Sequence, residues 1–171
     1  MMDRKTAIPE FKESEVSAMM EMEGLQDDEI KLTLMKMLPN GHPDMGEMPI
    51  LFFNIRLLDG TRIGQCDLRV GDSRHTEVLG HIGYGIDEKY RGHHYAAKAC
   101  RILMKYAARA HMPHVDITCN IDNIPSIRTC EFLHAQLLGT VEVPPDNIEY
   151  RNGSRMKYRY RIMLENDVQE S

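Results

Sequence analysis

The residues best suited to chemistry lie in the segment DEKYRGHHYAAKA, residues 87 to 99. His93 and His94 are neighbours in it, and imidazoles are common metal ligands. However, no third ligand follows at a spacing typical of a metal site, and Pro113 interrupts the helical face of the other paired histidines, in HMPH. We therefore predict no metal here.

The same segment has the features of an anion site. Arg91 and Gly92 lead into a run that opens a helix, and the first amides of a helix have no partner within it. Together with the helix dipole, such amides attract phosphate. Gly92 and Ala96 keep bulky side chains away, while Arg91 adds a positive charge. The sequence therefore predicts a phosphate site at this helix start.

Two glycines, Gly83 and Gly85, precede this turn in the stretch GHIGYGI and share one face of a strand. Such a pair marks either the close approach of a ligand or a bulge or packing contact, and both readings stay open. A basic helix stripe follows the turn, formed by Lys98, Arg101, Lys105 and Arg109. The stripe fits a solvent face, although Lys98 could also reach a phosphate. Taken together, the pattern suits an elongated ligand with a diphosphate at one end and a thin neutral arm along the strand.

At these residues the chain resembles the general-control-related N-acetyltransferase (GNAT) superfamily, in the branch that includes ribosomal-protein N-terminal acetyltransferases. The family's phosphate motif, Gln/Arg-x-x-Gly-x-Gly/Ala, is matched by Arg91-x-x-His94-x-Ala96. Because His94 replaces the central glycine, we expect its amide to serve from ordinary helical φ and ψ, with the imidazole pointing away. NIDNIPSIRTCEFLHA resembles the branch's Asn-x-x-Ser/Ala segment and maps Asn123 and Ser126 onto the cofactor's arm. The resemblance spans about Leu51 to Leu164.

The resemblance implies acetyl transfer from acetyl-CoA, as cosubstrate, to a primary amine, by direct transfer in a ternary complex. It implies that a backbone amide between Ile82 and Tyr84 stabilises the oxyanion. The cofactor-binding residues that we expect on this basis are Ile82, Gly83, Ile86, Arg91, Gly92, His93, His94, Tyr95, Ala96, Asn123 and Ser126.

The catalytic acid and base are expected among His81, Tyr84 and Glu77. Relatives in this branch often carry Glu where this chain has His81, and an imidazole with a pKa near ~6.5 can accept a proton at neutral pH. His81 can equally line the sheet, and Glu77 is a weaker base candidate. Many superfamily members protonate the thiolate with a Tyr that aligns with Cys130. We therefore expect either no dedicated acid or another residue such as Tyr84, and no acyl-enzyme on cysteine.

Hydrophobic patterning predicts helices over 10 to 22, 27 to 37, 96 to 110 and 122 to 135. Strands are predicted on both sides of Asp59-Gly60 and over 76 to 86, 114 to 119, 137 to 145 and 155 to 164, with a loop at 146 to 154. In the last strand, basic residues alternate with apolar ones and form either a solvated face or a contact for an acidic acceptor.

This order indicates an α/β fold. The resemblance implies the α+β type of this class. The fold would have a mixed, mostly antiparallel central sheet of about six or seven strands, splayed near the cofactor site and flanked by about four helices. We expect a single domain over 1 to 171, with N-terminal helices in 1 to 48 that shape the acceptor site, and the sheet and cofactor site in 50 to 164.

The bulk composition limits the partners. Lys and Arg number 21 against 26 Asp and Glu, a net charge of −5, which disfavours nucleic acid. The four cysteines form no Cys-x-x-Cys pair and follow no secretory leader, so we expect reduced thiols in the cytoplasm. No apolar run approaches the ~20 residues needed to cross a bilayer, so no membrane partner is expected.

The acceptor, a small molecule or a protein N-terminus, stays open at this stage, as does homodimerisation. A function of another class, a domain that binds acyl-CoA as a sensor or structural module without turnover, also stays open, because the family's Tyr is missing and His94 is irregular.

Overall fold

The structure is a computed structural model that describes residues 25–165. In this part of the chain the strands are β1 (Ile30–Leu38), β2 (Ile50–Leu57), β3 (Arg62–Arg69), β4 (Ile82–Ile86), β5 (His114–Asn120), β6 (Gln136–Glu142) and β7 (Met156–Met163). The helices are α2 (Arg74–Leu79), α3 (Tyr95–Arg109), α4 (Ile124–Phe132) and α5 (Ile148–Arg151), with a 3-10 turn η1 (Glu88–Tyr90). The predicted fold class is confirmed.

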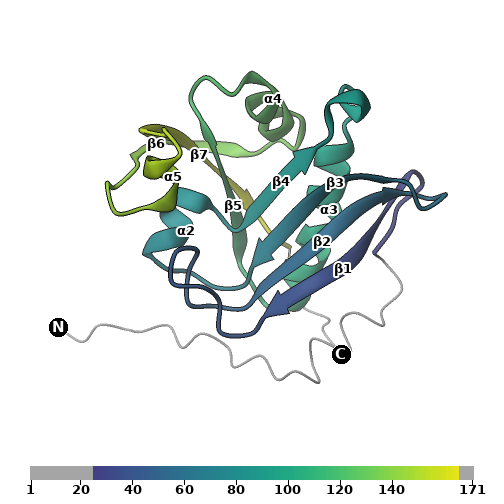
Figure 1. The fold of residues 1–171 in the computed structure, drawn as a ribbon, viewed down its shortest axis with the longest axis horizontal. Coiled ribbons are helices and arrows are strands. Elements are labelled where there is room, and N and C mark those ends of the chain that lie inside the picture. Colours follow the sequence, from purple (N-terminus) through teal and green to yellow (C-terminus); the bar gives the residue numbers. More distant parts are fainter. Residues whose placement is uncertain (1–24, 166–171) are drawn as a thin grey trace.

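The strands form two antiparallel sheets, in the orders β1-β2-β3-β4 and β5-β7-β6. Figure 1 shows α3 running behind the strands of the first sheet. The apolar face of α3, which includes Cys100, Leu103 and Tyr106, is buried against the inward side chains of both sheets, such as Phe53 and Ile117. Burial of this face is the main reason why the helix is stable here.

The β2–β3 hairpin has the predicted turn. Gly60 has φ 98°, a value that glycine accepts without strain, and the Thr61 amide donates to Asp59 Oδ1 at 2.9 Å. The helices predicted over 96 to 110 and 122 to 135 are confirmed in α3 and α4, and the strands predicted after them in β5, β6 and β7. The predicted loop 146 to 154 contains α5, which begins after the capping residue Asn147.

The helix predicted over 27 to 37 is wrong, because this segment carries β1. Ile30 and Leu32 are buried while Lys31 and Thr33, which alternate with them, are less so, and this is the alternation of a strand. Pairing with β2 along nearly the whole strand stabilises the extended backbone against the helical preference of its Leu, Lys and Met residues. The helix predicted over 10 to 22 lies outside the described residues.

The single strand predicted over 76 to 86 is also wrong in its first half, which is α2. The Ser73 side chain caps this helix by accepting from the His75 amide at 3.1 Å, and the Ser73 amide donates to Thr76 Oγ1. Gly80, with φ 70°, ends the helix, and β4 begins two residues later. A capping box with Thr in place of the usual Glu made this helix start hard to recognise.

The two sheets join at His81, just before β4. The Arg69 amide donates to His81 O at 2.7 Å, and the His81 amide donates to Asp116 O on β5, also at 2.7 Å. Beyond this junction β4 and β5 diverge (Figure 1), and the edge of β4 that faces β5 is left open. The predicted splaying is therefore present.

The basic face of β7 is tied to a buried carboxylate. Arg159 and Arg161 both donate to Asp116, at 2.8 to 3.1 Å, and Asp116 is completely buried. This part of β7 is therefore neither a fully solvated face nor a row of unpaired cations. Among the helices between residues 25 and 165, none has the length and apolar character that a membrane crossing requires.

Candidate active site

The predicted phosphate turn lies between the end of β4 and the start of α3. Gly92 and His94 have φ 89° and 60°, so the backbone turns through two left-handed residues before the helix begins. Within the described part of the chain, the amides of residues 92 to 97 donate no hydrogen bond. Arg91 Nε donates to Ile86 O at 2.9 Å and fixes the turn against β4. Six free amides at a helix N-terminus are suited to an anion.

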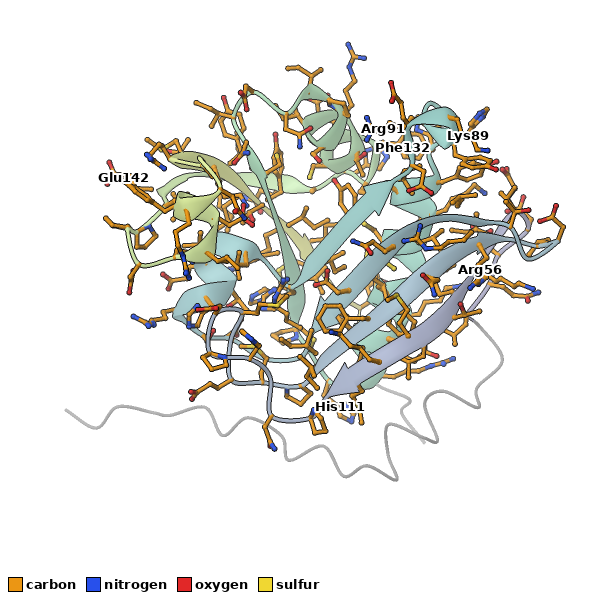
Figure 2. The ribbon with its side chains drawn as sticks, viewed as in Figure 1. Arg56, Lys89, Arg91, His111, Phe132 and Glu142 are labelled. Carbon is orange, nitrogen blue, oxygen red and sulfur yellow. The ribbon has the colours of Figure 1, made fainter. Side chains whose placement is uncertain are left out.

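His94 differs from the expectation, because its φ and ψ of 60° and 23° are left-handed and not helical. This conformation strains any residue except glycine. The His94 ring stacks on Phe132 of α4, with centroids 4.0 Å apart and planes 9° apart, and this contact compensates for the strain. Arg101 also lies over the Phe132 ring, at 5.1 Å. Figure 2 shows Arg91 and Phe132 at the same end of the molecule.

The open edge of β4 presents unpaired backbone groups. At the two ends of this strand, the Arg69 amide donates to His81 O and the Asp87 amide donates to Ile63 O. Because bonded and open positions alternate in an antiparallel ladder, the odd-numbered residues of β4, Gly83 among them, bond to β3. The residues whose N–H and C=O point to the open edge are Ile82, Tyr84 and Ile86, and of these groups Ile86 O accepts from Arg91 Nε. An extended ligand can pair with this edge as an added strand would.

The Tyr84 side chain leaves β4 on the face that carries α3. Its hydroxyl oxygen is buried and has no hydrogen-bond partner among the described residues. Burial raises the pKa of Tyr84, and the nearby Cys100 and Cys130 thiols raise it further. The hydroxyl therefore keeps its proton at physiological pH, beside the α4 residues Ser126 and Thr129. A buried hydroxyl that keeps its proton can donate to a ligand.

His81 is bonded through both ring nitrogens. Nε2 lies 2.7 Å from Asp72 Oδ1, and Nδ1 accepts from the Asp116 amide at 2.8 Å. Only 1% of the residue is exposed. Nδ1 must be unprotonated to accept the amide, so Nε2 carries the proton and donates to Asp72. The ring has no lone pair left for a substrate amine, and this geometry disfavours His81 as the base, although that role stays a prediction.

Comparison with known proteins gives the family. The sequence matches the acetyltransferase (GNAT) domain over residues 6–136, most of the chain. This chain belongs to the GNAT acetyltransferase family. No curated protein matches it in sequence.

Solved structures of GNAT enzymes have the same fold. RimL, a ribosomal L7/L12 alpha-N-protein acetyltransferase in complex with coenzyme A, superposes with a TM-score of 0.53 at 19% identity, over 69% of this chain and 64% of RimL. The chain thus spans slightly less than two thirds of that protein. An acetyltransferase from Salmonella typhimurium that modifies the N-terminal serine of the same ribosomal protein has a TM-score of 0.53 at 20% identity, over 68% of this chain and 64% of its own. The microcin C7 self-immunity acetyltransferase MccE, in complex with acetyl-CoA and AMP, has a TM-score of 0.52 at 19% identity, over 67% of this chain and 61% of its own.

The last two residues predicted to bind the cofactor, Asn123 and Ser126, lie at the start of α4. Asn123 caps α4 and accepts from the Ser126 amide at 3.3 Å. Cys130, at the position of the family's Tyr, is fully buried. A hydrogen bond with Cys119, together with burial, raises the pKa of Cys130. Cys130 is therefore a poor acid or nucleophile at neutral pH.

Lys98 is engaged by acidic residues rather than by the phosphate turn. Its Nζ lies 2.9 Å from Asp28 Oδ1 and 3.5 and 3.4 Å from carboxylate oxygens of Asp27 and Glu29. The hydrogen bond with Asp28 is the main reason why the pKa of Lys98 is raised. In this structure the ammonium is neutralised before it can serve an anion.

Glu77 lies apart from this group, and the rings of His93 and His94 contact different aromatic residues. Glu77 is exposed on α2, which packs against β5, β6 and β7. The His93 ring lies beside Tyr95, 5.3 Å between centroids, while the His94 ring lies on Phe132. Over residues 25 to 165, no three side chains of His, Cys, Asp or Glu gather as a metal site would require.

Sequence reasoning missed two residues of this region. Phe132 was treated only as part of a helix, and its contact with His94 depends on how α4 packs against α3. Asp67, the one carboxylate of β3, lies directly opposite Gly83. An acidic residue in a central strand was the signal that could have revealed it.

Proposed function

We propose that this chain transfers an acetyl group from acetyl-CoA to a primary amine, directly within a ternary complex. Membership of the GNAT family supports this reaction. The observation that carries the proposal is the pairing of two features: free amides at the start of α3 and an open edge along β4. A helix N-terminus suits the diphosphate of CoA, and a strand edge suits its amide-containing arm.

In this proposal the diphosphate lies on the amides of Gly92 to Ala96, and Arg91 supplies positive charge. His94 contributes its amide from the left-handed conformation that glycine would adopt. Its ring lies on Phe132 and so does not occupy the turn. Ala96 keeps the first helical turn free of bulk.

The arm of the cofactor pairs with the open backbone groups of Ile82 and Tyr84 and with the Ile86 amide, because Ile86 O already accepts from Arg91 Nε. Asn123 and Ser126, at the start of α4, face the arm from the other side. The Gly83 amide bonds to β3, so Gly83 contributes by lacking a side chain. This assignment adds the Tyr84 backbone to the expected cofactor-binding residues.

Tyr84 then takes part in the reaction through both its backbone amide and its hydroxyl group. The amine nitrogen attacks the thioester carbonyl carbon, and the Tyr84 amide, on the open edge, donates to the oxyanion. The carbon–sulfur bond breaks, and the Tyr84 hydroxyl protonates the leaving thiolate. Because the pKa of Tyr84 is raised by burial, its hydroxyl is protonated at neutral pH, as this role requires.

Direct transfer is favoured over an acyl-enzyme by the state of the thiols. Burial raises the pKa of Cys100 to about 12, and Cys130 is also held as a thiol. A thiol without a thiolate fraction is a weak nucleophile. All four cysteines are free and buried, in keeping with a reducing cytoplasm, where we expect the protein.

The acceptor is a small molecule or a protein N-terminus. Among the structural relatives, one modifies the N-terminal serine of a ribosomal protein, and another is a microcin C7 self-immunity acetyltransferase solved with acetyl-CoA and AMP. Homodimerisation stays a prediction.

A second candidate function, an acyl-CoA-binding module without turnover, is favoured by one observation: the family's Tyr position holds the buried Cys130. Incubation with acetyl-CoA and a panel of primary amines, with free CoA thiol and acetylated amine both quantified, distinguishes the two. We expect thiol release that depends on the amine. A thermal shift with acetyl-CoA but no release with any amine would favour the second candidate, and the absence of both would contradict the two proposals.

A further inference from the structure

The carboxyl group of Asp67 occupies the space beside β4 that Gly83 leaves empty. Asp67 on β3 pairs with Gly83 on β4, and a Cβ built on Gly83 would lie 2.6 Å from Asp67 Oδ1. Cys66 and Leu68, on either side of Asp67, are buried on the face that packs against α3. Asp67 therefore points to the opposite face of the sheet.

This position is one residue from the proposed oxyanion donor, the Tyr84 amide. The α3 face of β4 is filled, since Ile82 is buried there and the Tyr84 side chain packs against the core. An amine can therefore reach a thioester on the β4 edge from the face that carries Asp67. The carboxyl group lies on the side from which the nucleophile arrives.

The surroundings of Asp67 leave polar atoms unsatisfied. Arg69 Nη1 and Asp67 Oδ2 form an ion pair at 3.1 Å that lacks hydrogen-bonding geometry, and Oδ2 and Arg69 Nε are both buried without a hydrogen bond among the described residues. Arg69 itself is 5% exposed, and the Asp67 side chain 18%. Buried polar atoms without partners are rare and costly, and a polar ligand at this site would satisfy them.

The charges around Asp67 suit proton transfer. Burial raises the pKa of Asp67 and Arg69 lowers it, with a net rise. The residues opposite Asp67 on the neighbouring strands, Phe52 on β2 and Gly83 on β4, do not titrate. The next cation across the sheet is Lys36 on β1, whose Nζ lies over the Phe52 ring. A carboxylate of raised pKa is a stronger base than an exposed one.

We propose that Asp67 is the catalytic base, which accepts a proton from the acceptor's ammonium group. The inference rests on the proposed acetyl transfer and replaces His81 in that role, since both nitrogens of His81 are engaged. An ammonium group loses two protons in becoming an amide. The first passes to the Asp67 carboxylate and from there to solvent. The second leaves the nitrogen after attack and passes to solvent, and solvent returns a proton to Tyr84 after its hydroxyl has protonated the departing thiolate.

The test compares wild type with Asp67→Asn, using the most active amine of the panel, below the unfolding midpoints of both proteins. Asn keeps the shape and removes the proton acceptor. We expect kcat to fall by about 10² or more and CoA affinity to be unchanged. We also expect the pH–rate profile to lose its acid limb, the fall in rate at low pH that protonation of the base causes. Asp59→Asn, in the β2–β3 turn, removes an exposed carboxylate and should match wild type.

A second variant changes the position of the carboxyl group without removing it. Gly83→Ala places a Cβ against Asp67 Oδ1 and should lower kcat while acetyl-CoA still raises the melting temperature. An Asp67→Asn enzyme with the wild-type kcat and pH profile would overturn the role of Asp67 and leave the acetyltransferase proposal standing. A lower kcat with an unchanged acid limb would also overturn it, because a merely structural role predicts that result. If wild type itself releases no CoA with any amine, both proposals fail.

Discussion

His94 lies flat on Phe132, with ring centroids 4.0 Å apart and planes 9° apart, while its backbone is left-handed at φ 60°. The left-handed conformation raises the free energy of a non-glycine residue by about 1–2 kcal/mol, and an aromatic stack stabilises it by about 0.5–1.5 kcal/mol. The two are similar in size. The stack therefore lets a histidine occupy a backbone position where the GNAT motif has glycine.

Removal of the stack should weaken the phosphate turn. We predict that Phe132→Ala lowers CoA affinity about fivefold, the equivalent of about 1 kcal/mol. In a His94→Gly background the same substitution should cost nearly nothing, because glycine adopts this φ unaided. Titration calorimetry on the two single variants and the double variant measures the coupling. Equal effects of Phe132→Ala in both backgrounds would show that the stack does not support the turn.

Tyr84→Phe separates catalysis from stability. Within residues 25–165 the hydroxyl has no well-formed hydrogen bond, so its loss should leave the unfolding free energy unchanged or raise it by about 1 kcal/mol. We expect kcat to fall by about 10² or more, because the leaving thiolate loses its proton donor. Steady-state kinetics and thermal melts measure the two effects, with Tyr158→Phe on β7 as the control. Unchanged kcat would remove Tyr84 from the mechanism.

His81 joins the two sheets, and its substitution should act on stability. We predict that His81→Ala lowers the unfolding free energy by about 2–4 kcal/mol, because the Asp116 amide loses its acceptor and a cavity forms. Urea denaturation measures this loss, and His75→Ala on α2 serves as the control. The shape of the pH–rate profile should not change. Loss of a limb near pH ~6.5 would instead support the prediction that His81 is the base.

Asp116 should make the protein sensitive to acid. Burial opposes its ionisation, but hydrogen bonds from Arg161 and Arg159 outweigh burial, and the pKa of Asp116 is lowered. A carboxyl group whose pKa is lower in the folded state stabilises the fold above its unfolded pKa. This stabilisation is lost as the pH falls through the folded value. Asp116→Asn should remove that part of the acid dependence and cost about 3–5 kcal/mol at neutral pH, since two partly buried arginines lose their counterion.

Urea denaturation of wild type and Asp116→Asn from pH 7 down to pH 3 checks both effects. If the two stability curves remain parallel throughout that range, the pair of arginines does not set the acid limit.

The part of the site that is local in sequence could be predicted, and the part that depends on packing could not. Arg91, Gly92 and Ala96 mark the predicted phosphate turn, and the helix start that follows them is present because helix starts obey short-range rules. The conformation of His94 was missed because Phe132, 38 residues later in the sequence, supports it. Asp67 was missed because only the β3–β4 register places its carboxyl group in the space beside Gly83.

The fold follows the same division. The β2–β3 hairpin and α3 carry strong local signals and were predicted. The segment at β1 combines helix-forming residues with a strand's alternation, and pairing with β2 decides between them. The splayed junction was expected from the resemblance alone, since no local pattern encodes the bonds of His81 to β3 and β5.

Titration of acetyl-CoA into wild type and Ala96→Glu is the most direct test of the central claim, that acetyl-CoA binds at the start of α3. The new carboxylate would lie in the first helical turn, among the free amides, and repel the diphosphate. Ala108→Glu, near the other end of α3, is the matched control. We predict saturable binding by wild type and the control, and none by Ala96→Glu in a folded protein. Equal binding by all three would contradict the placement of the cofactor and the function built on it.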